Sequence, residues 1–232
     1  AGIVADSAGV GDYTVRAINA SGTVAWTRRY DGPVGGYDWP AAISVTPAGR
    51  VYVTGESQGT ASVESATLGF SATGDSLWTS RFDGPGNLLD RGFALRATGD
   101  GRIYVAGVSE DSVTSSNILT LCYDDAGTLL WSRTFDDISG IDEAGDLTID
   151  PAGRVIVTGK VTRGASKDTV DCDFATIAYS AAGDTVWRWR YDGPAGETDI
   201  PAAVVADDAG AYFVTGESQG VGTGLDFATI RF

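Results

Sequence analysis

The 232-residue chain contains no histidine and no methionine, and only two cysteines and two lysines. The absence of histidine excludes serine and cysteine nucleophiles that depend on a histidine base, and it excludes histidine-ligated zinc or iron sites. Carboxylates, arginines and tyrosines are left as the groups that could do catalysis. Cys122 and Cys172 stand at different points of the repeats described below, so we expect both to be free thiols.

Long apolar runs and positive charge are also scarce. The sequence has no uninterrupted apolar stretch of the length that crosses a bilayer and no signal-peptide pattern, so we expect no membrane-spanning helix. Sixteen basic residues face 31 acidic ones, for a formal charge of −15. This balance argues against a nucleic-acid partner and suits solubility, cation binding or a basic partner.

What the sequence does contain is a repeat. The phrase "VTGESQG" stands at 53–59 and again at 214–220, with degenerate copies "VAGVSED" at 105–111 and "VTGKVTR" at 157–163. Four tryptophans recur at intervals of 52, 53 and 56 residues, namely Trp26, Trp78, Trp131 and Trp187. Repeats of about 53 residues over 1–232 predict a single domain made from one supersecondary unit.

Each unit contains four short segments rich in Val, Ile, Thr and aromatic residues, bounded by Gly, Asp and Ser. Such segments predict β-strands, and gaps too short for crossover helices predict antiparallel pairing. A four-stranded antiparallel sheet repeated at this period indicates an all-β fold, a β-propeller. We name the strands A to D from the axis outward. Strand D carries the tryptophan, which we expect between neighbouring blades, with a ligand-stacking role as the alternative.

Strand A is expected to begin near residues 1, 39, 91, 143 and 200, which predicts five blades with the first and last incomplete. Residues 1–9 are assigned to an A strand because they resemble 202–210, although a weaker alignment sets 1–5 against the B strand at 211–215. The chain lacks methionine and both ends fall inside a repeat. The alternative is therefore a fragment of a larger propeller, with sheet faces and strand edges exposed.

The phrases "YDGP" and "YVTG", with D-[YF]-x-T and G-x-x-x-W, resemble the bacterial β-propeller repeats called SBBP over essentially the whole chain. The third repeat departs, with "FDDI" at 135–138 and "VIVTG" at 155–159. The resemblance implies a propeller in large exported bacterial proteins, beside other modules. A secreted or cell-surface location is what it implies for this chain, and it carries over no catalytic residue.

The face of the domain that carries the D–A and B–C loops is the predicted binding face. Its B–C loops are long and unlike one another, such as "SEDSVTSSN" and "KVTRGASKDTVDCD", and most of the acidic residues fall there. Variable loops on a rigid scaffold commonly carry binding groups. We predict a non-enzymatic module that recognises a glycan or a protein. The alternative is a carbohydrate-active enzyme that uses carboxylates at the channel mouth.

The candidate ligand site lies where strand A begins. A constant aspartate is followed there by a residue that differs between repeats, namely Trp39, Arg91, Glu143 and Ile200. An aromatic, a cation and an acid at one mouth resemble a polar pocket with a stacking surface. The predicted site is Tyr37, Trp39, Arg91 and Glu143, and the alternative is that these side chains only fill or solvate the mouth.

Each blade junction also carries a pair of aspartates that could hold calcium. The pairs are Asp31 and Asp38, Asp83 and Asp90, Asp136 and Asp142, and Asp192 and Asp199. Their spacing does not match an EF-hand, and an aspartate beside a turn often caps backbone N–H groups instead. Calcium is therefore a hypothesis, and we predict no other cofactor.

Overall fold

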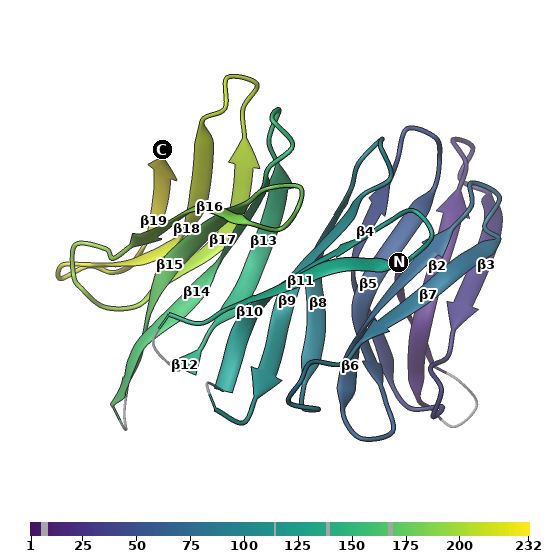
Figure 1. The fold of residues 1–232 in the computed structure, drawn as a ribbon, viewed down its shortest axis with the longest axis horizontal. Coiled ribbons are helices and arrows are strands. Elements are labelled where there is room, and N and C mark those ends of the chain that lie inside the picture. The colour runs from purple at the N-terminus through teal and green to yellow at the C-terminus, as the bar shows by residue number, and fades with distance from the viewer. Residues whose placement is uncertain (6–8, 114, 138–139, 167–168) are drawn as a thin grey trace.

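The computed structural model describes residues 1–5, 9–113, 115–137, 140–166 and 169–232. These residues form 19 β-strands and no helix (Figure 1), so the all-β prediction is confirmed. None of them belongs to a helix long and apolar enough to cross a membrane. Both cysteines are free and buried, as expected.

The strands form five sheets, each in chain order and antiparallel except for one short parallel pair. The first sheet contains β1 (Gly2–Ala5), β2 (Gly11–Ile18) and β3 (Val24–Tyr30). The second contains β4 (Asp38–Val45), β5 (Val51–Gln58), β6 (Val63–Phe70) and β7 (Ser76–Phe82). The third contains β8 (Asp90–Ala97), β9 (Ile103–Asp111), β10 (Ser115–Tyr123), β11 (Leu129–Phe135) and the parallel β12 (Gly140–Ile141).

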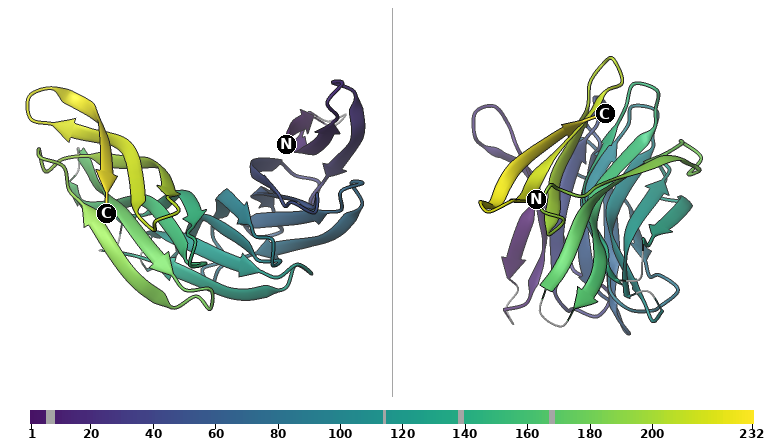
Figure 2. Two further views of the ribbon diagram at one scale, coloured as in Figure 1. Left: turned by 90° about the horizontal axis from the view of Figure 1, so that it is seen from above. Right: turned by 90° about the vertical axis from the view of Figure 1, so that its left-hand side faces the viewer.

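The fourth sheet contains β13 (Glu143–Ile149), β14 (Val155–Ser166), β15 (Thr169–Tyr179) and β16 (Thr185–Tyr191). The fifth contains β17 (Asp199–Ala206), β18 (Tyr212–Gly220) and β19 (Gly224–Arg231). The sheets stack face to face in the manner of propeller blades, along an open arc with the first and fifth sheets at opposite ends (Figure 2). The A strands β4, β8, β13 and β17 each contact the next.

Apolar side chains fill the space between successive sheets. Tyr13 of the first sheet packs with Val53 and Leu68 of the second, and Phe174 of the fourth packs with Val204 and Val214 of the fifth. All of these side chains are at most 2% exposed. Because both faces of a middle sheet are covered, its central strands are buried along nearly their whole length, as β5 and β10 show.

The repeated tryptophans lie between neighbouring sheets, as predicted. The indole N–H of Trp26 donates to the carbonyl of Ala72 in the next sheet (3.1 Å), and Trp78 does the same to Asp125 (3.0 Å). Trp131 donates to Ala181 (3.1 Å). Each acceptor lies in a turn between strands C and D, so a tryptophan ties its own sheet to the turn of the following one.

Two expectations about local structure were wrong, and one strand was not foreseen. Residues 2–5 form β1, which pairs with β2 in the place of a B strand, because a hairpin joins a strand to the one that follows it. The long B–C loops are mostly strand, since β5 continues to Gln58 and β9 to Asp111 before short turns. β12 was not foreseen, and it pairs in parallel with Ser115 and Ser116 of β10.

Candidate functional site

The loops that precede strand A lie against the ends of strand B, on the face where the site was expected. The N–H of Gln58 donates to the carbonyl of Tyr37 (3.0 Å), and the N–H of Glu110 donates to that of Leu89 (2.8 Å). Gln219 and Thr198 repeat this contact in the fifth sheet at 3.0 Å. In the second, third and fifth sheets, main-chain bonds therefore hold the start of strand A against the end of strand B.

A β-bulge follows the start of every A strand. The register shifts between Pro40 and Ala42 in β4 and between Gly92 and Ala94 in β8. β13 and β17 shift at the matching places. A bulge changes the direction in which the neighbouring side chains point. The residues before these bulges are those that the repeats vary.

Trp39 and Arg91 meet at one cavity of about 360 Å³, lined also by Pro40, Glu56 and Phe93. Trp39 is 50% exposed, so about half of the residue is open to solvent. The ring of Tyr37 lies 5.4 Å from that of Trp39 and supports it from the side. The structure thus brings together three of the four predicted ligand residues.

Glu143 lies elsewhere. Its carboxylate pairs with the ammonium of Lys160 on the adjacent strand at 2.9 Å, and it does not line the cavity of Trp39 and Arg91. Along the arc β4 contacts β8 and β8 contacts β13, so β8 stands between the strands that carry Trp39 and Glu143. A ligand role for Glu143 stays a prediction.

Glu56 is the site residue that sequence reasoning missed. It pairs across the sheets with Arg91, and only 7% of the residue is exposed. Burial raises the pKa of its carboxyl, and the charge of Arg91 opposes that rise. The signal was present in the repeated phrase "VTGESQG" at 53–59, where Glu56 is the only acidic residue.

The second aspartate of each junction is a loop cap. Asp38, Asp90, Asp142 and Asp199 are all 0% exposed. Each accepts the N–H of a residue in the preceding loop, from Gly32 (2.8 Å), Gly84 (2.8 Å), Asp137 (3.0 Å) and Gly193 (2.6 Å) respectively. A buried carboxylate that orders a tight loop accounts for the constant aspartate without any ligand.

Two junctions gather three carboxylates within 4.8 Å of one another, namely Asp12, Asp31 and Asp38, and Asp173, Asp192 and Asp199. An arginine already pairs with one carboxylate of each group, Arg29 with Asp12 and Arg190 with Asp173 at 2.6 Å. A calcium ion would have to compete with these guanidinium groups. Calcium binding stays a hypothesis, to which the structure adds Asp12 and Asp173 as possible ligands.

Asp90 yields a pH prediction. Burial raises its pKa to about 6, above the value of 3.8 for an unperturbed aspartate. An acid whose pKa is higher in the folded state contributes most to stability below the unfolded pKa, and loses that contribution as the pH rises through the folded pKa. Asp90→Asn cannot ionise and keeps an oxygen for the Gly84 N–H. Its stability relative to the parent should therefore increase from about pH 4 to pH 6 and then level off. Urea unfolding at several pH values tests this, and a difference that does not change with pH would contradict it.

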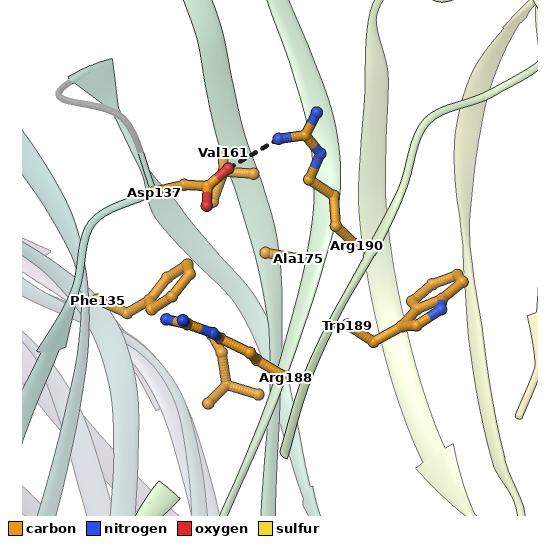
Figure 3. Close-up of a pocket in the computed structure, with 8 residues that line it drawn as sticks. Phe135, Asp137, Val161, Ala175, Arg188, Trp189 and Arg190 are labelled. Carbon is orange, nitrogen blue, oxygen red and sulfur yellow. Dashed lines mark hydrogen bonds and ion pairs between the residues drawn. The ribbon is translucent and has the colours of Figure 1, made fainter.

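A second cavity of about 150 Å³ lies between the third and fourth sheets (Figure 3). The guanidinium carbon of Arg188 stands 6.0 Å from the centre of the Phe135 ring, and Arg190 pairs with Asp137 at 2.9 Å. The floor is apolar, with Val161 and Ala175. Arg188 takes the place of a hydroxyl residue in the other repeats (Thr27, Thr79 and Ser132), which was an unused signal in the sequence.

No family model and no curated protein matches the chain. Among solved structures, it is similar to a subtype N11 neuraminidase-like protein of A/flat-faced bat/Peru/033/2010 (H18N11), with 10% sequence identity and a TM-score of 0.46. The match covers 95% of this chain and 68% of that one. The function must therefore be argued from the chain's own geometry.

Proposed function

We propose that this domain is a non-enzymatic binding or scaffold module that recognises a glycan, or a protein, through the face bearing the D–A loops. The single observation that carries the proposal is the cavity where a half-exposed Trp39 stands beside the ion pair of Arg91 and Glu56. An open aromatic face beside fixed polar groups is the usual composition of a small-ligand site.

The chemistry of the cavity suits a neutral sugar better than a charged ligand. An indole face packs against the apolar C–H face of a pyranose ring, because both surfaces are flat and weakly hydrated. Arg91 supplies donors and Glu56 supplies acceptors, which together match hydroxyl groups. Since the two charges cancel, the cavity does not require an ionic partner.

We expect Trp39→Ala to weaken glycan binding by about 10-fold, which corresponds to about 1.4 kcal/mol of lost contact. The midpoint of thermal unfolding should hardly change, because half of the side chain already faces solvent. A printed array of neutral and acidic oligosaccharides, read with parent and variant protein, tests this.

The matched control is Phe227→Ala, which removes an aromatic side chain that is 82% exposed at the far end of the arc. This control should retain full glycan binding. If Trp39→Ala lowers stability as much as the loss of a core residue, Trp39 is structural, and the mouth is not the site.

A second candidate function is a carbohydrate-active enzyme. The raised pKa of Glu56 favours it, since a buried carboxyl beside an open cavity is the pattern of a general acid. Glu56 is also the only carboxyl among the residues that line this cavity in the described part of the chain, whereas glycosidases commonly use a pair. If the Glu56→Gln variant still binds the glycan but no longer turns it over, the result favours the enzyme hypothesis.

We further propose that the five sheets are blades of an SBBP-type propeller in a secreted or cell-surface bacterial protein, beside other modules. The support is the repeat wording together with the face-to-face stacking of the sheets. Localisation of the full-length protein by cell fractionation tests the second part, and a protein retained in the cytoplasm would contradict it.

A further inference from the structure

The cavity between the third and fourth sheets is lined by residues at which the repeat changes its wording (Figure 3). Arg188 stands where the other tryptophan strands have a hydroxyl residue. Asp137 stands where the other three D–A loops have a glycine, and Val161 stands where the other B strands have a serine. Three departures from the repeat therefore meet in one cavity, which lies within the array and away from both of its ends.

The glycine of the other loops has a structural reason, since a Cβ there would collide with the serine of strand B. At Gly193 an added Cβ would lie 2.4 Å from Oγ of Ser218. In the fourth sheet Val161 takes the place of that serine, and Asp137 takes the place of the glycine. The side chain of Asp137 reaches Arg190 across the cavity at 2.9 Å. The two changes thus occur together and give this junction a geometry of its own.

The two arginines of the cavity differ in their partners. Arg190 is committed to carboxylates, because it lies 2.9 Å from Asp137 and 2.6 Å from Asp173. Arg188 forms no ion pair and no hydrogen bond with any residue that the structure describes, and its guanidinium carbon stands 6.0 Å from the centre of the Phe135 ring. The N–H groups of an arginine form a planar fork that matches a carboxylate. At Arg188 this fork is open.

Below the guanidinium the cavity is apolar. Val161, Ala175 and Ile177 line it and are at most 3% exposed. In the third sheet Leu119 holds the place of Ala175, so the fourth sheet lacks a side chain that would fill the floor. The cavity measures about 150 Å³, and an apolar cavity of that volume holds a benzene ring.

We propose that this cavity is a second ligand site, and that it takes a small monocarboxylate whose apolar body is about the size of a phenyl ring. The carboxylate pairs with the fork of Arg188. The apolar body packs on the ring of Phe135 and on the floor at Ala175. None of the residues at the cavity of Trp39 takes part, so this site is independent of the proposed glycan site.

Benzoate is the probe that tests the proposal. It is titrated into isotope-labelled 232-residue protein and followed in two-dimensional amide NMR spectra. We expect saturable shifts at millimolar benzoate for the amides of Val161 and Ala175 and for the side-chain N–H of Arg188. Benzyl alcohol, which has the ring without the charge, should bind about 10-fold more weakly, and benzylamine should not bind.

Arg188→Ser separates a ligand site from a surface arginine, because it introduces the residue that the third sheet has at Ser132. This variant should bind benzoate about 10-fold more weakly, since it loses the charge-assisted hydrogen bonds. Arg188 is exposed, so the midpoint of thermal unfolding should hardly change. The matched control is Arg28→Ser, which removes an arginine 5.9 Å from the Trp26 ring and outside this cavity. It should bind benzoate like the parent.

Ala175→Leu tests the floor, because the added side chain fills the space assigned to the apolar body while Arg188 stays in place. It should abolish the benzoate shifts. If this variant fails to fold, the comparison of Arg188→Ser with the parent decides alone. Equal affinity of those two proteins for benzoate, equal affinity of the parent for benzoate and benzyl alcohol, or no saturable shift at millimolar benzoate would each overturn the proposal.

Discussion

Replacing Trp131 by alanine is expected to lower the free energy of unfolding by about 3–5 kcal/mol, the range for a large aromatic side chain removed from a core. Trp131 is 9% exposed, and its ring centre lies 6.0 Å from those of Tyr104 and Tyr179. The carbonyl of Ala181 in the next sheet also loses the indole N–H that it accepts. The variant thus leaves a void and breaks a tie between two sheets.

Urea unfolding followed by circular dichroism measures the effect. Trp39→Ala is the matched control, because Trp39 is 50% exposed and donates no hydrogen bond across sheets among the described residues. We expect its cost to stay below about 1 kcal/mol, as for a surface substitution. Similar losses in the two variants would show that the position between the sheets is not what stabilises the fold.

The second large effect is expected from Arg190→Ala, at about 3 kcal/mol, because a buried carboxylate is left without its nearest partner. Asp173 is 0% exposed and lies 2.6 Å from Arg190, whereas Arg163, the other cation, stands at 3.5 Å. Burial already raises the pKa of Asp173 to about 6, against the opposing charge of both arginines. Removing one of them favours the neutral carboxyl further.

A double-mutant cycle separates this pairing from lost packing. In the Asp173→Asn background, Arg190→Ala should cost about 1 kcal/mol or less, because the buried carboxylate with which Arg190 pairs is no longer there. Arg96→Ala serves as the surface comparison, since Arg96 is 45% exposed and meets Asp146 at 3.3 Å. A cost for Arg190→Ala that is the same in both backgrounds would contradict a buried ion pair.

The repeat made most of the fold predictable. Asp38, Asp90 and Asp199 begin strands as the shared phrases indicated, and the tryptophans lie between sheets. Those residues recur because each makes the same kind of contact in its own unit. A residue that is repeated in the sequence therefore indicates a contact that is repeated in the structure. The place of β1 was not predictable in this way, since a short apolar segment does not state which neighbour it pairs with.

The candidate site was only partly predictable for a related reason. Variation at the start of strand A correctly drew attention to Trp39 and Arg91, which share a cavity. Glu56 was overlooked because the repeated motif that contains it was interpreted as having only a structural role. Glu143 was grouped with Trp39 and Arg91 because all the A strands were assumed to begin at one common channel mouth. In the structure, the curvature of the arc decides which strands meet.

The bond from each tryptophan to the turn of the following sheet has an evolutionary consequence. Three units share this joint, in which the tryptophan donates to a turn of the next sheet, as Trp131 does to the carbonyl of Ala181, two residues before Gly183. Gly183 has a φ of 85°, and a Cβ there would lie 2.7 Å from the Trp131 ring, so this half of the joint admits little else. A duplicated or deleted gene segment of one whole unit leaves every remaining joint matched. Such a chain can lengthen or shorten by whole units without any new interface having to evolve.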